Sequence, residues 1–159
     1  MDDNIKLKLS DEVISNYKKL AELLTNRKPE HFRMGLFAHD CRQQKIPPNK
    51  AERHNSCETT ACALGWAAIL GVGKTNYKSW QEYHLNNFAG PVLSRGKKDV
   101  CYQWCFSGLW EFVDPTPEGV VARINYMLEH GIPSDYYEQV RGEETYIFVH
   151  KVQGWMKKL

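Results

Sequence analysis

Residues 61–70 form the longest apolar run of this chain, and they constrain its fold more than any other feature. A surface helix keeps a polar stripe, whereas a helix that is apolar on nearly all sides is normally buried in the middle of a domain. Ser56 can cap a helix that carries Glu58 in its first turn, and Gly71 follows the last apolar residue, as is typical of a helix end. The run therefore predicts a buried central helix over residues 58–70.

Length and composition indicate one globular unit. A chain of 159 residues can bury its own core as a single domain. The sequence contains no apparent repeat, low-complexity tract or linker, so we predict one domain over residues 1–159. Within it, residues 1–8 are the segment that we expect to be disordered if any is. The formal charge of +2 is small and the basic residues are scattered, which disfavours a nucleic-acid partner.

Targeting signals are not recognisable in the sequence. The acidic start Met1-Asp2-Asp3 is unlike a signal segment, and no run reaches the roughly 18 apolar residues that a membrane span needs. We therefore expect a cytoplasmic protein without membrane contact. In such a reducing compartment, the odd number of five cysteines favours free thiols or a metal over disulfides.

Further helices are predicted around the central one. Periodic apolar positions and cap residues place them at residues 10–26, 29–37, 79–88, 100–112 and 116–130, and the polar residues 42–55 with Pro47-Pro48 are predicted to be a loop. Residues 145–149 favour a strand that pairs with residues 138–140. The predicted fold class is mainly α with a small β part (α+β). It is a compact helical domain whose buried central helix is clasped by the helices near Trp104 and after Thr116, with a small C-terminal β-hairpin.

Residues 68–75 match the pattern of a phosphate-binding loop, with Ala68 in place of the first glycine. In such a loop backbone N–H groups surround the phosphates, a lysine (here Lys74) neutralises them and a hydroxyl holds magnesium, all between a strand and a helix. Here the preceding residues are predicted to be helical, and the chain has too few apolar strand runs for a parallel sheet. We therefore favour a helix end with a glycine turn and keep a nucleotide hydrolase as an alternative.

The candidate zinc ligands are Cys41 beside His39, then His54, Cys57 and Cys62, and then Cys101 and Cys105. Structural zinc sites usually take two ligands from a knuckle with a spacing of about two to four residues, whereas Cys57 and Cys62 are five apart. Cys101 and Cys105 share a helical face, which suits either two thiolates on a metal or two small core residues. We expect buried cysteines and no cofactor, with a structural zinc-binding protein as an alternative.

Cys57 is also a candidate for a cysteine nucleophile. It lies at the predicted start of the central helix, where a thiol pKa is lowered, and His54 precedes it by three residues. No acyl-transfer signature surrounds it. We therefore predict no catalytic residue and keep an enzyme with this nucleophile as an alternative.

Aromatic residues at the edges of the predicted elements could line a groove, or they could seal the packing between helices. Stacking on such rings, together with a nearby cation, is an effective way to hold a small anion. The predicted ligand-binding set is Trp80, Tyr77, Tyr137, Lys74 and Arg95.

Three motifs together resemble a known family. They are Cys57-x-Thr59-x-Ala61-Cys62-x-x-Gly65-Trp66-Ala67, the preceding Phe32-x-Met34 and the following Thr116-Pro117-Glu118-x-x-x-x-Arg123-Ile124. Over residues 32–131 the chain resembles a family of small uncharacterised proteins encoded by bacteria and their phages, which usually carry glycine where this chain has Glu58. The resemblance implies a mostly helical intracellular domain, supplies no catalytic residues and suggests a phage accessory protein that acts on a host system.

The predicted function is that of a non-enzymatic binding protein. Its expected partner is either a host protein or a small anionic ligand such as a nucleotide, which it would sequester. An oligomer is an alternative to a monomer, because no sequence feature decides the oligomeric state.

Overall fold

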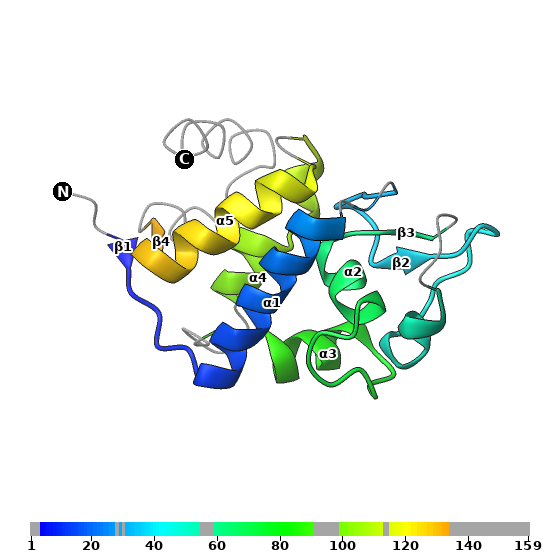
Figure 1. Cartoon of the computed structure of the whole chain (residues 1–159), viewed down its shortest axis with the longest axis horizontal. Coiled ribbons are helices and arrows are strands. Elements are labelled where there is room, and N and C mark those ends of the chain that lie inside the picture. The colour runs from blue at the N-terminus through cyan, green and yellow to red at the C-terminus, as the bar shows by residue number, and fades with distance from the viewer. Residues whose placement is uncertain are drawn as a thin grey trace.

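The computed structural model describes residues 4–27, 29, 31–54, 59–90, 99–112 and 115–133, and it is mainly helical with short strands (Figure 1). The α-helices are α1 (Asp11–Arg27), α2 (Ala63–Ile69), α3 (Trp80–Asn87), α4 (Val100–Cys105) and α5 (Pro117–His130). The other described elements are the 3₁₀ helices η1 (Pro48–His54) and η2 (Gly108–Phe112) and the strands β1 (Asn4–Ile5), β2 (Ala38–His39), β3 (Thr60–Ala61) and β4 (Ile132–Pro133). The predicted class, mainly α with a small β part, is confirmed. None of the described helices is long and apolar enough to cross a membrane.

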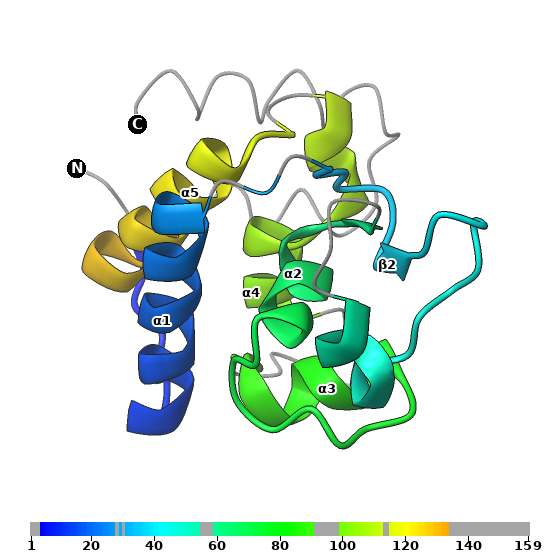
Figure 2. The same ribbon diagram turned by 45° about the vertical axis from the view of Figure 1, so that its right-hand side comes forward.

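The two longest described helices, α1 and α5, pack along each other (Figures 1 and 2). Both begin as predicted. The Ser10 hydroxyl accepts a backbone N–H from the first turn of α1 at 3.2 Å. At the start of α5 the Thr116 hydroxyl accepts a backbone N–H at 3.0 Å, and Pro117 takes the first helical position. The chain leaves α5 through Gly131 at φ +83°, a conformation that favours glycine, and β4 then pairs with β1.

Helix α2 is the predicted central buried helix, but it begins later than predicted. All of its residues, Ala63–Ile69, are buried. The residues before it form β3, which pairs with β2, and Cys62 stands at the N-cap with an extended backbone. A helix start before residue 62 is therefore wrong, because Thr60 and Ala61 are engaged in sheet pairing.

The neighbours of α2 also differ in part from the prediction. Its extensive contacts are with η1, whereas α5 packs mainly on α1 and to a lesser extent on α4. The link between α4 and α5 includes the buried Trp104, whose indole N–H donates to the Arg123 carbonyl at 2.9 Å. Helix α5 therefore joins the core through α1 and α4 rather than by clasping α2.

The described residues between α1 and α2 form β2, η1 and β3 with isolated bridges and turns, and they include no α-helix. A helix over residues 29–37 is wrong, because Phe32 forms a parallel bridge to Ala61 and the chain continues into β2. The predicted loop over residues 42–55 contains η1, which opens on Pro48. A proline suits a first helical turn because its missing N–H would have no partner there. The predicted C-terminal hairpin, residues 138–149, lies outside the described residues.

Candidate functional site

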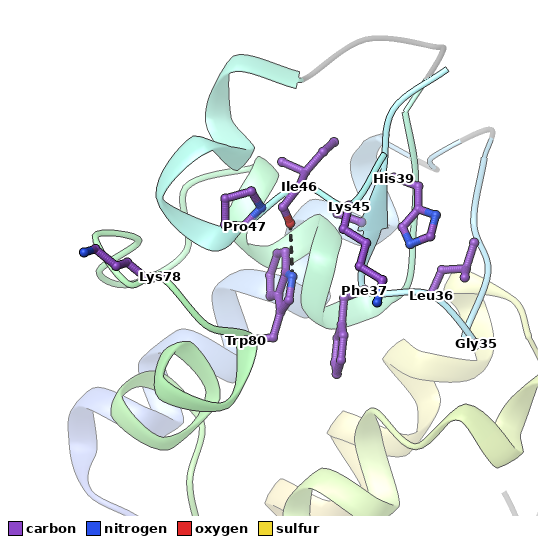
Figure 3. A pocket seen from close by; sticks show the side chains of 10 residues that line it. Gly35, Leu36, Phe37, His39, Lys45, Ile46, Pro47, Lys78 and Trp80 are labelled. Atoms are coloured by element: carbon purple, nitrogen blue, oxygen red, sulfur yellow. Dashed lines mark hydrogen bonds between the residues drawn. The ribbon is translucent and has the colours of Figure 1, made fainter. Parts of the chain in front are cut away.

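A pocket of about 500 Å³ opens beside the start of α3 (Figure 3). Three segments form it: the strand β2 with the residues that precede it, the residues before η1 and the loop before α3. The lining residues in the described chain are Gly35, Leu36, Phe37, Ala38, His39, Lys45, Ile46, Pro47, Lys78 and Trp80. Residues far apart in the sequence thus meet at a cavity of the size that takes a small molecule.

Two aromatic rings form a wall of this pocket. The rings of Phe37 and Trp80 lie nearly parallel, with 5.7 Å between centroids and 11° between planes. The Trp80 indole N–H donates to the Ile46 carbonyl at 3.1 Å (Figure 3), and its ring makes a perpendicular contact with Tyr83 at 5.8 Å between centroids. Trp80 is therefore held in place, whereas Phe37 remains 40% exposed. An exposed phenylalanine beside a cavity offers an apolar surface that a ligand can cover.

The cysteine-and-tryptophan motif around the start of α2 positions the Phe37 side of the pocket. The Cys62 N–H donates to the carbonyl just before Phe37 at 2.7 Å, and the Trp66 indole N–H donates to the His31 carbonyl at 3.1 Å. Gly65 lies directly against the Phe37 carbonyl, so that a Cβ atom there would collide with this oxygen. The motif acts as a scaffold, because it fastens the segment that carries Phe37 to the buried helix.

The ionisable side chains in the described lining of the pocket are basic. Lys45, Lys78 and His39 belong to its lining (Figure 3), and the described lining includes no aspartate or glutamate. The adjacent Asp40 carboxylate is used within its own turn, where it accepts two backbone N–H groups at 2.9 Å each. An apolar wall with basic side chains around it favours an anionic ligand that also has a flat apolar part.

The predicted ligand-binding set is brought together only in part. Trp80 lies in the pocket. Tyr77 is half-buried, and Lys74 is exposed on the loop after α2, but neither residue belongs to the described lining. Arg95 and Tyr137 lie outside the described residues. The basic side chains that accompany Trp80 are therefore lysines other than the predicted Lys74.

The segment that matches a phosphate-binding loop has a different geometry. It follows helix α2 instead of a strand, and Gly71 and Gly73 adopt φ values of +75° and +68°. The buried Asn87 side chain accepts the Lys74 N–H at 2.9 Å and donates to the Lys74 carbonyl at 2.8 Å. Because these backbone groups are already bonded and no helix begins directly after Thr75, the segment does not form a phosphate cradle. The favoured prediction of a helix end with a glycine turn is confirmed.

The candidate metal ligands do not form a cluster in the described part of the chain. No group of three His, Cys, Asp or Glu side chains among those residues is placed to hold a metal ion. Cys62 is buried at the start of α2, and Cys101 and Cys105 are buried on α4. His54 ends η1, and Cys57, the candidate nucleophile, lies outside the described residues.

Burial makes these core thiols poor nucleophiles. It raises the pKa of Cys62 to about 11, and it raises the pKa of Cys101 and of Cys105 well above the ordinary thiol value. Since the thiolate is the reactive form, we expect iodoacetamide to modify these three cysteines at least about a hundredfold more slowly than the exposed Cys41. Peptide mass mapping with and without denaturant measures the rates. Rapid native labelling of any of the three would contradict the described packing.

Most of this pocket is not found by sequence reasoning. The sequence places Phe37 in a helix and Lys45 in a loop, it indicates His39 only as a candidate zinc ligand beside Cys41, and it indicates no ligand-binding role for Lys78. The sequence offers no apolar/polar alternation here, because Phe37 and Ala38 are both apolar and only His39 is polar. Strands of two residues are too short for such a period to be recognised.

Comparison with protein-family models, with curated proteins and with solved structures gave no match for this chain.

Proposed function

We propose that this protein binds a small anion with a planar ring without catalysing a reaction, and that the ligand class is a nucleotide. The observation that carries the proposal is the exposed Phe37 ring, which stacks on the fixed Trp80 beside a cavity whose described charges are basic. The ring of the ligand lies against the open side of Phe37. Its negative charge lies near the basic side chains of the lining.

The two parts of this interaction respond differently to salt. Stacking of one base on an aromatic side chain contributes about 1–3 kcal/mol by alanine substitution, and it changes little with ionic strength. The attraction between the exposed Lys45 and an anion is screened, with a Debye length of about 8 Å at physiological ionic strength. Raising the salt concentration therefore weakens binding without abolishing it.

The contents of the pocket support binding rather than covalent chemistry. The described lining holds no cysteine and no pair of carboxylates. General acid–base and nucleophilic catalysis need such partners within hydrogen-bonding reach.

Thermal unfolding in the presence of each of the four ribonucleoside 5′-monophosphates tests the proposal. We expect at least one of them to raise the melting temperature of the wild type in proportion to the logarithm of its concentration. Titration followed by tryptophan fluorescence then gives its Kd. Phe37→Ala is expected to weaken that binding about tenfold or more, because it removes the stacking surface.

Leu85→Ala is the matched control. Leu85 is also a large exposed apolar side chain, 49% exposed on α3, but it does not belong to the described pocket lining. Its replacement is expected to leave Kd unchanged. Absence of a response to all four nucleotides would overturn the proposed function, and unchanged affinity of Phe37→Ala would show that the ligand does not lie on this ring.

As part of the same proposal, the protein is a cytoplasmic accessory protein of a phage or a bacterium that sequesters its ligand. The motif resemblance around Cys62 and Trp66 supports this setting. A host protein is the competing occupant of the exposed aromatic surface. The nucleotide titration separates the two, because a surface made only for a protein partner predicts no response to nucleotides.

A further inference from the structure

The short sheet beside the pocket carries three polar side chains in register. Strand β2 pairs with β3 so that His39 lies opposite Thr60, and Lys45 forms an antiparallel bridge with His39 on its other side. Directly opposed residues of antiparallel strands point to the same face, with Cβ atoms about 4.5–5.5 Å apart. The ammonium, imidazole and hydroxyl groups therefore belong to one row.

The opposite face of this sheet is the core side. Ala38 and Ala61 are in register with each other and are 1% and 0% exposed. Phe37 directly precedes β2, and both Phe37 and His39 line the pocket. The polar row therefore begins next to the exposed ring on which the proposed ligand stacks.

The two lysines of the pocket are not equivalent. Figure 3 shows Lys45 on the same side of Trp80 as Phe37 and His39, with its amino group directed toward Phe37. Lys78 lies on the other side of Trp80, and its side chain points away. A ligand whose ring covers Phe37 can therefore bring its charged group to Lys45. The same charged group would not reach Lys78.

We propose, building on the proposed function, that Lys45, His39 and Thr60 form an anion subsite that holds the phosphate of a nucleoside 5′-monophosphate. A phosphate offers three strong acceptor oxygens, and the row offers three donor groups. The base lies on Phe37, and the phosphate lies over the outer face of β2 and β3. Recognition thus has two parts. The aromatic surface accepts any base, and the subsite selects a phosphate over an uncharged hydroxyl.

The test compares each nucleoside 5′-monophosphate with its nucleoside, by fluorescence titration, in the wild type and in two variants with the same chemical change. We expect the wild type to prefer the nucleotide by about tenfold or more, as charge-assisted hydrogen bonds usually give. Lys45→Met is expected to remove most of this preference while leaving nucleoside affinity unchanged. Lys78→Met is the matched control, since Lys78 is also an exposed lysine of the same lining, and it is expected to keep the preference.

The outcomes separate this inference from the proposed function. If neither nucleotides nor nucleosides bind, the proposed function fails. If both bind with equal affinity in the wild type, or if Lys78→Met removes the preference as fully as Lys45→Met, the stacking site stands and the subsite is wrong. Thr60→Val, which keeps the shape of the side chain and removes the hydroxyl, is expected to weaken nucleotide binding several-fold and to leave nucleoside binding unchanged.

Discussion

Replacing Gly65 with alanine is expected to lower the free energy of unfolding by about 3 kcal/mol or more, as overpacking against rigid backbone does. The new Cβ would collide with the Phe37 carbonyl oxygen and would lie 2.7 Å from the Ala61 Cβ. Neither side can move easily, because Cys62 and Trp66 hold the opposing segment by hydrogen bonds. Helix propensity by itself gives the opposite sign, since alanine in a helix is about 1 kcal/mol better than glycine.

Denaturant titration followed by circular dichroism measures this change, with Gly108→Ala as the control. A Cβ at Gly108 would lie 3.6 Å from the Met34 carbonyl oxygen, which is an ordinary contact. That variant is expected to stay within about 1 kcal/mol of the wild type. A Gly65→Ala protein that is more stable than the wild type would show that α2 does not lie against the Phe37 backbone, and the scaffold role of the motif would be lost.

The second large effect is a loss of about 3 kcal/mol of stability in acid, caused by one buried histidine. His84 on α3 is 5% exposed, and its Nε2 has no hydrogen-bond partner among the described residues. Its ring packs at right angles to those of Tyr102 and Phe106, at 5.1 and 5.7 Å between centroids. Burial lowers the pKa of His84 to about 4, although the nearby Asp99 carboxylate acts in the opposite direction.

The direction of the pH dependence follows from the two pKa values of this side chain. In the unfolded chain His84 takes up a proton near its ordinary pKa of 6.5, whereas in the folded protein it does so only near 4. Between these values the unfolded state binds more protons, so acid favours unfolding. The stabilisation by the neutral ring is complete above pH 6.5 and is lost as the pH falls toward 4.

Denaturant titrations between pH 7 and pH 4 of the wild type and of His84→Phe isolate this contribution, because phenylalanine keeps an aromatic ring and cannot be protonated. The variant is expected to gain about 3 kcal/mol relative to the wild type as the pH falls over this range. His130→Gln serves as the comparison for loss of a histidine outside the core, since the His130 side chain is 49% exposed. A difference in the free energy of unfolding between the wild type and His84→Phe that does not change with pH would contradict the burial of His84.

The helix starts that the sequence predicts well are those with a local physical cause. Ser10, Ser79 and Thr116 each place a hydroxyl where a backbone N–H of the first turn needs an acceptor, and all three do so in the structure. The same holds for Gly71, whose positive φ follows the end of α2. These features depend on residues within one helical turn of each other, so they can be recognised in the chain itself.

The errors occur where a distant segment competes with local preference. Thr60 and Ala61 lie in a stretch that favours a helix, yet they pair with β2 more than twenty positions earlier. Phe37 is predicted to be helical for the same reason, but its backbone is held by α2. Tertiary hydrogen bonding therefore decided these positions against propensity.

The candidate site shows the same division. Trp80 could be predicted because an aromatic residue just after a cap lies at the edge of an element, but Phe37 and Lys45 could not, because they reach it only through pairing across the chain. By itself the sequence determined that the chain is mainly helical around a buried central segment, since periodicity, caps and apolar content act locally. Only the tertiary structure decided which aromatic ring stays exposed and which lysine stands beside it, because long-range backbone pairing sets both positions.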